Sequence, residues 1–222
     1  FEVSGAYARK LSDRFSAAVA AKFIYSNLAS GQVVGGNEIK PGTAGAADIS
    51  LTYKAPIKFT KNKSDFTLGV AISNLGSKIT YTNSTNRDYI PTNLGLGLGW
   101  LFHLDDYNTI TITSDFNKLL VPTPRPDIDE DGDKIPDYRQ YSPIRGIFKS
   151  FGDAEGGFTE ELKEITTSLG VEYWYDDQFS VRAGYFYENY SKGNRKYFSV
   201  GLGVKYNIFG LNFSYLVPTT NQ

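Results

Sequence analysis

The 222-residue chain is nearly neutral, with 23 basic and 24 acidic side chains, and this balance argues against nucleic acid as a partner. It contains no cysteine, which excludes disulfide bonds and thiol chemistry, and aromatic residues make up 15% of it. No stretch approaches the roughly 18 consecutive apolar residues of a transmembrane helix, so a membrane protein with this sequence has to cross the bilayer with strands.

Along much of the chain, apolar residues alternate with small or polar ones, which is the period-2 pattern of β-strands. About ten such runs are separated by segments rich in Gly, Asn, Ser, Thr or charged residues. In chain order the runs cover residues 1–9, 15–26, 48–54, 66–73, 93–102, 109–116, 169–175, 179–187, 195–206 and 211–217. The sequence therefore predicts an all-β protein.

The connections between these runs alternate in length. Long segments cover residues 27–45, 74–90 and 117–164, whereas other connections are as short as Asp-Asp-Gln at 176–178. Short turns at one edge and long loops at the other are typical of outer-membrane β-barrels. Runs of about 9 to 12 residues also suit tilted membrane strands, because strands of soluble domains centre near 5 or 6 residues.

The last two runs indicate which face of the predicted strands contacts lipid and which face lines a lumen. One face of run 195–206 carries Phe198, Val200, Leu202, Val204 and Tyr206, and the other carries Ser199, Gly201, Gly203 and Lys205. A tight turn follows and the pattern resumes, so the two runs predict a hairpin. Because the second face is small and carries few charges, and aromatic residues gather at the run ends, we expect the apolar face to meet lipid and the Gly and Ser face to line a lumen. The alternative is a soluble β-sandwich or a lipocalin-like barrel.

We therefore predict a single transmembrane antiparallel β-barrel domain over residues 1–222, in a bacterial outer membrane with its long loops on the extracellular side. If the short turns face the periplasm, the first run starts and the last run ends on the outer side, whereas a closed barrel has both ends in the periplasm. The runs are thus expected to be a fragment of a barrel with at least about 12 strands, lacking N-terminal strands and a closing strand. Phe1 in place of an initiator methionine also predicts that any signal peptide lies upstream.

Two blocks of sequence carry a family resemblance: "LGLGLGWLFHLDDYNTITITSDFNKLLVPT" at 94–123 and "RAGYFYENYSKGNRKYFSVGLGVKYNIFGLNFSYLVPT" at 182–219. They resemble the PorV family (also called LptO) of outer-membrane proteins in the type IX secretion system, relatives of the FadL fatty-acid transporters. The resemblance extends over nearly the whole chain. It implies a FadL-like barrel of about 14 strands in the full protein, of which about 10 are present here.

The resemblance also implies a function. Proteins of this family act as shuttles, which accept the C-terminal domain of a secreted substrate at the SprA translocon and carry it to the PorU attachment complex. The implied partners are SprA, the C-terminal domains of substrates, the PorU complex and outer-membrane lipid. The alternative is a FadL-like channel for hydrophobic small molecules. A lipid A deacylase is a third interpretation, but the sequence offers no hydrolase site, so we predict that the protein is not an enzyme.

The strongest local motif is the acidic stretch "DIDEDGDKIPDY". Its carboxylates are Asp127, Asp129, Asp131, Asp133 and Asp137. Alternate carboxylates next to a glycine allow the backbone to wrap a hard cation with several oxygens. The stretch begins like an EF-hand loop but lacks the glutamate at the twelfth position, and it is more similar to a thrombospondin type 3 calcium repeat. The sequence predicts a calcium site here; the alternative is a solvated acidic loop.

Two other groups of polar residues are candidates for a functional role. His103, the single histidine, lies beside Asp105 and Asp106, but no G-x-S-x-G nucleophile motif accompanies it, so we interpret it as an interfacial turn residue. Four basic residues fall on the predicted inward face and are candidates to line a polar lumen. They are Lys22, Lys54, Arg182 and Lys205.

The segment 142–164 combines apolar side chains at helical spacing with a capped helix signal, in which Thr159 precedes acidic residues. Its apolar residues are Ile144, Ile147, Phe148 and Phe151. Such residues either fold over the barrel mouth or present an apolar surface to a protein. We expect them, with loops 27–45 and 74–90, to form the contact with the cargo and the translocon.

Overall fold

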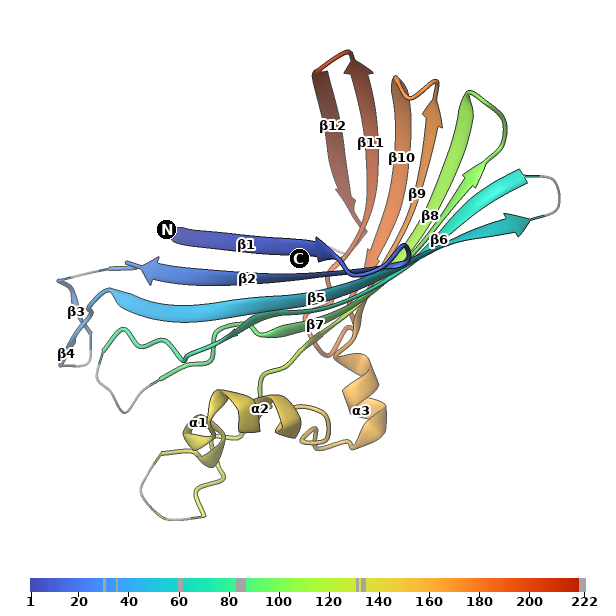
Figure 1. Cartoon of the computed structure of the whole chain (residues 1–222). Coiled ribbons are helices and arrows are strands. Elements are labelled where there is room, and N and C mark those ends of the chain that lie inside the picture. The colour runs from blue at the N-terminus through green and yellow to red at the C-terminus, as the bar shows by residue number, and fades with distance from the viewer. Residues whose placement is uncertain are drawn as a thin grey trace.

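A computed structural model describes residues 1–29, 31–34, 36–59, 62–82, 87–130, 132 and 135–219. Ten strands form one antiparallel sheet in the order β1-β2-β5-β6-β7-β8-β9-β10-β11-β12 (Figure 1). They are β1 (Glu2–Lys10), β2 (Phe15–Ser26), β5 (Gly42–Phe59), β6 (Asn62–Gly76), β7 (Asn93–His103), β8 (Asn108–Leu119), β9 (Thr166–Tyr175), β10 (Phe179–Tyr187), β11 (Lys196–Tyr206) and β12 (Phe209–Pro218). The prediction of an all-β, antiparallel fold is confirmed.

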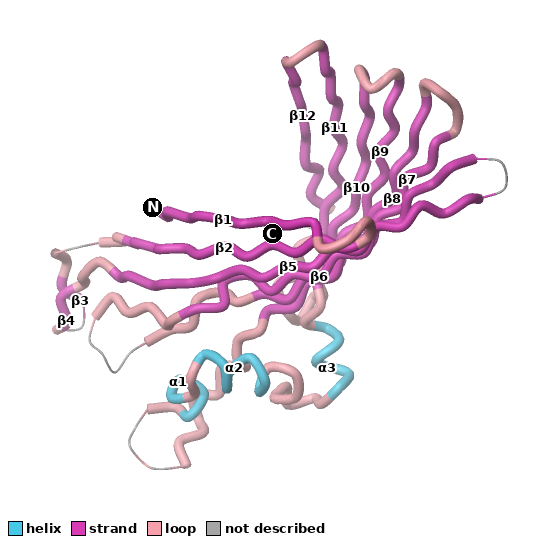
Figure 2. Tube along the Cα trace, in the orientation of Figure 1, coloured by secondary structure: helices cyan, strands magenta, loops and turns pink. Residues whose placement is uncertain are grey.

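The remaining elements lie in the long connections. A two-stranded hairpin of β3 (Val33–Val34) and β4 (Asn37–Glu38) belongs to the connection between β2 and β5. Three short helices, α1 (Asp137–Gln140), α2 (Pro143–Lys149) and α3 (Phe158–Lys163), belong to the connection between β8 and β9. Figure 2 shows that these helices lie together beside one edge of the sheet. Within the described residues no helix is long and apolar enough to cross a membrane.

Several strands are longer than their alternating patterns predict. β5 begins at Gly42, inside the predicted loop 27–45, and pairs with β2 from there on, Gly42 lying opposite Ser26. The first residues of β5 are glycine, alanine and threonine, so their alternation has no apolar contrast for a sequence pattern to detect. β6 runs on to Gly76 and β8 to Leu119, so these strands also extend into the predicted loops 74–90 and 117–164.

The sheet is strongly twisted and open, with β1 and β12 at its two ends (Figure 1). The short connections, such as the turn between β9 and β10, lie at one edge, which we call the turn edge. The long connections lie at the other, the loop edge. This asymmetry agrees with the alternating lengths of the connections in the sequence, and most of the irregular structure lies at one end of the strands.

The sheet exposes apolar side chains on one face and buries small or polar residues on the other, which is the reverse of the arrangement in a soluble protein. On β11, Val200 and Leu202 are 51% and 60% exposed, whereas Gly201 and Gly203, which alternate with them, are buried. We call the exposed apolar face the outer face and the opposite one the inner face. A large contiguous apolar surface of this kind is costly in water and is typical of a surface that contacts lipid. The exposure pattern therefore agrees with the predicted membrane barrel.

Polar side chains cross-link the inner face. Lys22 of β2 forms an ion pair with Asp48 of β5 at 2.8 Å. Arg182 of β10 pairs with Glu172 of β9, and its Nη1 donates a hydrogen bond to Asn212 of β12 at 2.7 Å. The two ion pairs join neighbouring strands, and the hydrogen bond to Asn212 spans β11. All of them lie on the inner face, where charged groups are less costly than next to lipid.

Buried apolar packing is concentrated at the loop edge. Ile79 and Ile90, from the connection between β6 and β7, pack with Ala44 near the start of β5. The backbone of Ile79 also pairs with Asp88 in an isolated bridge. This small cluster packs the β6–β7 connection against the sheet. The loop edge therefore has a local apolar core, against which other segments can pack.

Candidate functional site

The connection between β8 and β9 is the longest at the loop edge and carries α1, α2 and α3. Ser142 caps the helix by accepting a hydrogen bond from the backbone N–H of Arg145 at 3.3 Å, and Pro143 occupies the first turn. α3 follows Gly157, whose φ of 64° places it in the left-handed region that favours glycine. Thr159 lies inside α3 and not at its cap, so the capping prediction for Thr159 is wrong.

α2 packs through small residues and exposes large ones. Gly146 and Ser150 are buried, and a Cβ on Gly146 would lie only 3.0 Å from the Tyr89 ring and 3.1 Å from Pro122. Ile144 and Phe148, on the opposite side of the helix, are 64% and 75% exposed. The close approach at Gly146 thus fixes the helix with its apolar side chains outward.

The four apolar residues predicted to bind a partner do not form one stripe. Ile144 and Phe148 share a side of α2, one turn apart, and both are exposed. Ile147 is half-buried. Phe151 is exposed but follows the end of α2 at Lys149. The structure thus leaves Ile144 and Phe148 as the exposed pair, with Phe151 on a separate segment.

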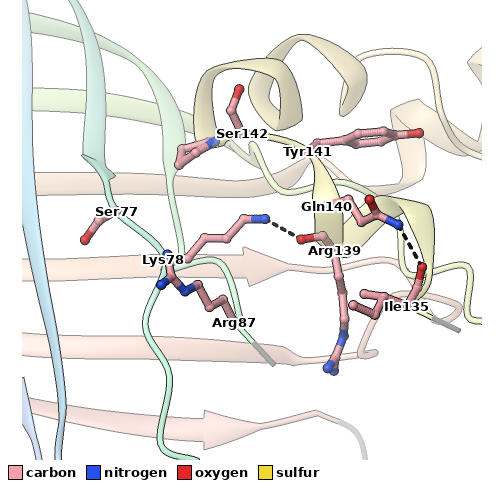
Figure 3. A pocket seen from close by; sticks show the side chains of 9 residues that line it. Ser77, Lys78, Arg87, Ile135, Arg139, Gln140, Tyr141 and Ser142 are labelled. Carbon is pink, nitrogen blue, oxygen red and sulfur yellow. Dashed lines mark hydrogen bonds between the residues drawn. The ribbon is translucent and has the colours of Figure 1, made fainter. Parts of the chain in front are cut away.

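Tyr89 and Lys78 attach the helical segment to the core of the loop edge. The Tyr89 hydroxyl lies 2.9 Å from the carbonyl oxygen of Tyr138 and 2.8 Å from that of Tyr141, to which it can donate. Lys78 Nζ donates to the carbonyl oxygen of Arg139 at 2.5 Å (Figure 3) and lies 4.2 Å from the centre of the Tyr89 ring. Carbonyls at the end of a helix lack intrahelical partners, so these side chains satisfy groups of α1 that the helix leaves open.

A basic pocket of about 510 Å³ lies between the β6–β7 connection and the β8–β9 connection (Figure 3). Lys78 and Arg87 contribute from one side and Arg139 from the other. Burial lowers the pKa of Lys78, and the nearby Arg87 charge lowers it further. The sequence does not reveal this pocket, because its basic residues are far apart in the chain and are brought together only by the docking of α1.

We expect alkaline pH to release the helical segment through Tyr89. Burial and the neighbouring Tyr141 raise the pKa of Tyr89 to about 12, although the Arg145 charge acts in the opposite direction. Only the protonated phenol can donate its single hydrogen to one of these carbonyl oxygens, so its contribution is complete below the ordinary tyrosine pKa near 10 and is lost as the pH rises through about 12. Because amide exchange is base-catalysed and rises with pH in any peptide, the rates are compared with those of the unfolded chain at the same pH. On this scale, the protection of residues 138–150 should fall in this window. Tyr89→Phe should exchange faster at neutral pH already; equal exchange in both proteins would contradict the role of the hydroxyl.

Two carboxylates of the acidic stretch accept hydrogen bonds from backbone groups of the same stretch. Asp129 Oδ1 accepts the backbone N–H of Gly132 at 2.9 Å, and Asp137 Oδ1 accepts that of Glu130 at 3.2 Å. Asp127 belongs to the same described segment. The other two predicted ligands, Asp131 and Asp133, lie outside the described residues. Within the described part no group of three or more acidic or histidine side chains is placed to hold a metal, and calcium binding stays a prediction.

Calcium titration checks this prediction. Extracellular calcium modules bind with dissociation constants on the order of 10⁻⁴ to 10⁻³ M, so we expect heat of binding in this range for the purified protein. The double variant Asp127→Asn, Asp129→Asn should lose it, whereas Asp13→Asn, an acidic residue of a short turn at the opposite edge, should not. No binding at millimolar calcium would rule the site out.

Most of the other polar candidates have structural partners, whereas Lys205 is exposed near the end of β11. His103 Nε2 faces Asp65 at 3.8 Å, while Asp105 Oδ1 accepts the backbone N–H groups of Tyr107 and Asn108 at 2.8 Å each. Asp105 therefore closes the turn between β7 and β8 and does not orient His103. Of the predicted lumen residues, Lys22 and Arg182 take part in the inner-face pairs, and Lys54 pairs with Asp65 at 3.5 Å.

Comparison with known proteins agrees with this arrangement of strands and loops. A search of curated proteins found no match to the chain. A family model described as type IX secretion system protein PorV matches residues 1–126, which is more than half of the chain and covers the strands from β1 to β8. On this match, the chain belongs to the PorV family of type IX secretion system proteins.

Proposed function

We propose that the protein is the outer-membrane shuttle of the type IX secretion system. In this proposal its loop edge faces the cell exterior and receives the C-terminal domain of a secreted substrate from the SprA translocon. The protein then delivers that cargo to the PorU attachment complex. Membership of the PorV family supports a role in secretion, and the all-β fold supports a place in the outer membrane.

The observation that carries the proposal is the exposed apolar pair on α2. Ile144 and Phe148 project away from the packed side of the helix, which is fixed by Gly146, Tyr89 and Pro122. A large apolar pair held outward on a docked helix is the kind of anchor that buries into a protein partner. Its place at the loop edge leaves it accessible to a cargo domain outside the barrel.

The inner face argues against the alternative of a FadL-like channel. Along the described strands this face carries ion pairs such as Lys22 with Asp48 and Arg182 with Glu172. A route for hydrophobic molecules needs a continuous apolar lining, because burying a polar group next to an apolar ligand costs free energy. The polar pairs of the inner face interrupt such a lining.

A pull-down from detergent-solubilised outer membrane separates the two functions. Tagged protein should retain secreted proteins that share a C-terminal domain, together with the translocon. Recovery of lipid or fatty acid without such cargo would favour the channel and overturn the shuttle. Deletion of residues 144–151 in a protein that still assembles should reduce cargo recovery, which distinguishes capture at α2 from capture elsewhere.

A further inference from the structure

The strand register places α3 against the outer face of the sheet. Leu94 and Leu96 belong to the apolar series of β7, and their partners across the β7–β8 ladder are Lys118 and Phe116. Directly paired residues of antiparallel strands project to the same face. Lys118 therefore projects to the outer face, close to the loop edge, where a lone cation next to lipid would be costly.

Two glutamates of the α3 segment neutralise Lys118. Lys118 Nζ lies 2.8 Å from Glu161 Oε2 and 2.6 Å from Glu164 Oε2, and both Lys118 and Glu161 are buried. Lys192, from the connection between β10 and β11, adds ion pairs to Glu160 at 2.7 Å and to Glu164 at 3.0 Å. These ion pairs hold the charged side of α3 against the outer face of the sheet. The apolar side of α3 is therefore directed away from the ion pairs.

The apolar side of α3 is continuous with the apolar outer face of the strands. A pocket of about 260 Å³ lies between them. Its apolar lining comes from Leu94, Leu96 and Phe116 of the strands together with Phe158, Leu162 and Ile165, and Asn117, Lys118 and Glu161 also line it. Phe158 and Leu162, which are four residues apart on α3, are 76% and 51% exposed, and Phe151 also borders the pocket. The pocket thus opens on the same outer face that carries the exposed leucines and valines of the strands.

We propose that α3 is an interfacial membrane anchor, whose apolar side lies in the outer edge of the lipid layer with a lipid acyl chain in the pocket beside it. Continuity with the lipid-contacting face of the strands identifies the occupant as an acyl chain. Large apolar side chains backed by charged groups at the level of the strand ends are typical of elements that lie in a membrane interface. The anchor is independent of the shuttle function, since it concerns how the β8–β9 connection is held and not what it carries.

Fluorescence quenching of single-cysteine variants tests the anchor, because the natural chain has no cysteine to remove. Leu162→Cys and Phe158→Cys are labelled with bimane, and Ile144→Cys on α2 serves as the matched exposed control. The full protein is reconstituted in vesicles of phosphatidylcholine with brominated acyl chains, with unbrominated vesicles as reference. We expect bromine to quench the labels at 162 and 158 severalfold more than the label at 144, and aqueous iodide to show the opposite order.

Two outcomes would overturn the anchor. Strong iodide quenching at 162 and 158 without bromine quenching would place α3 in water. Protection of both labels from both quenchers would place α3 beneath protein, as a docking surface for another chain. The two labelled positions guard against misfolding of one variant, because either one suffices to locate the helix.

Discussion

Replacing Lys118 with methionine is expected to release α3 from the barrel wall at a cost of about 3 kcal/mol in local stability. The methionine keeps an apolar side chain on the outer face but leaves the buried Glu161 carboxylate without its cation. Glu164 retains Lys192, whereas Glu161 retains only uncharged backbone partners among its named contacts, the N–H of Ala154 at 2.9 Å and a backbone hydrogen bond from Asp153. Hydrogen exchange of residues 154–165 should therefore rise by about 100-fold, the equivalent of that free energy.

Lys10→Met is the matched control for this variant. It removes the same charge, but its pair with Asp13 at 3.2 Å is highly exposed at the turn edge and such pairs contribute little. Exchange of residues 154–165 should be unchanged in this control. If Lys118→Met also left their exchange at the level of the natural protein, the ion pairs would not be what holds α3.

The same pairs predict an acid-sensitive attachment. Burial by itself raises the pKa of Glu161, but hydrogen bonds from Lys118 and the Ala154 backbone, with the Lys118 charge, more than offset it and leave the pKa below its ordinary value. A carboxylate of this kind stabilises the folded state above its ordinary pKa, and this stabilisation is lost as the pH falls through the lowered one. Acidification should therefore loosen α3 in the natural protein, whereas Lys118→Met should lose this dependence.

Replacing Ile144 and Phe148 with serine should reduce capture of a C-terminal-domain cargo by at least about tenfold. Burial of each large apolar side chain contributes roughly 1.5 to 3 kcal/mol, and about 1.4 kcal/mol corresponds to a tenfold change in affinity. The helix itself should survive, because its cap at Ser142 and its contact at Gly146 are untouched. Binding of purified cargo domain to the protein in detergent measures the effect.

The control for this pair is the double variant Leu11→Ser, Leu104→Ser. Both leucines are exposed, at 60% and 46%, but they lie in short connections at the turn edge. Cargo binding should be unaffected there. Undiminished binding in the α2 variant would show that the cargo contacts another part of the loop edge.

Much of the fold was predictable because strand periodicity is a local property. The alternation of Val200 and Leu202 with Gly201 and Gly203 follows from the pleat of a single strand, and so it can be read without knowing the neighbour. The pattern failed where it had no apolar contrast, as in the small residues after Gly42. The prediction that Thr159 caps α3 was wrong because a positive φ at Gly157 decides where α3 begins, and the local acidic pattern does not reveal this backbone conformation.

The sequence by itself determined the strands, the division between turns and loops, and the apolar character of one face. Only the tertiary structure decided that Lys118 lies on the outer face with Glu161, and that Tyr89 holds α1 and α2 at the loop edge. These contacts join residues 43 and 49 positions apart. Their free energy depends on register and on the docking of distant segments, so no local pattern records them.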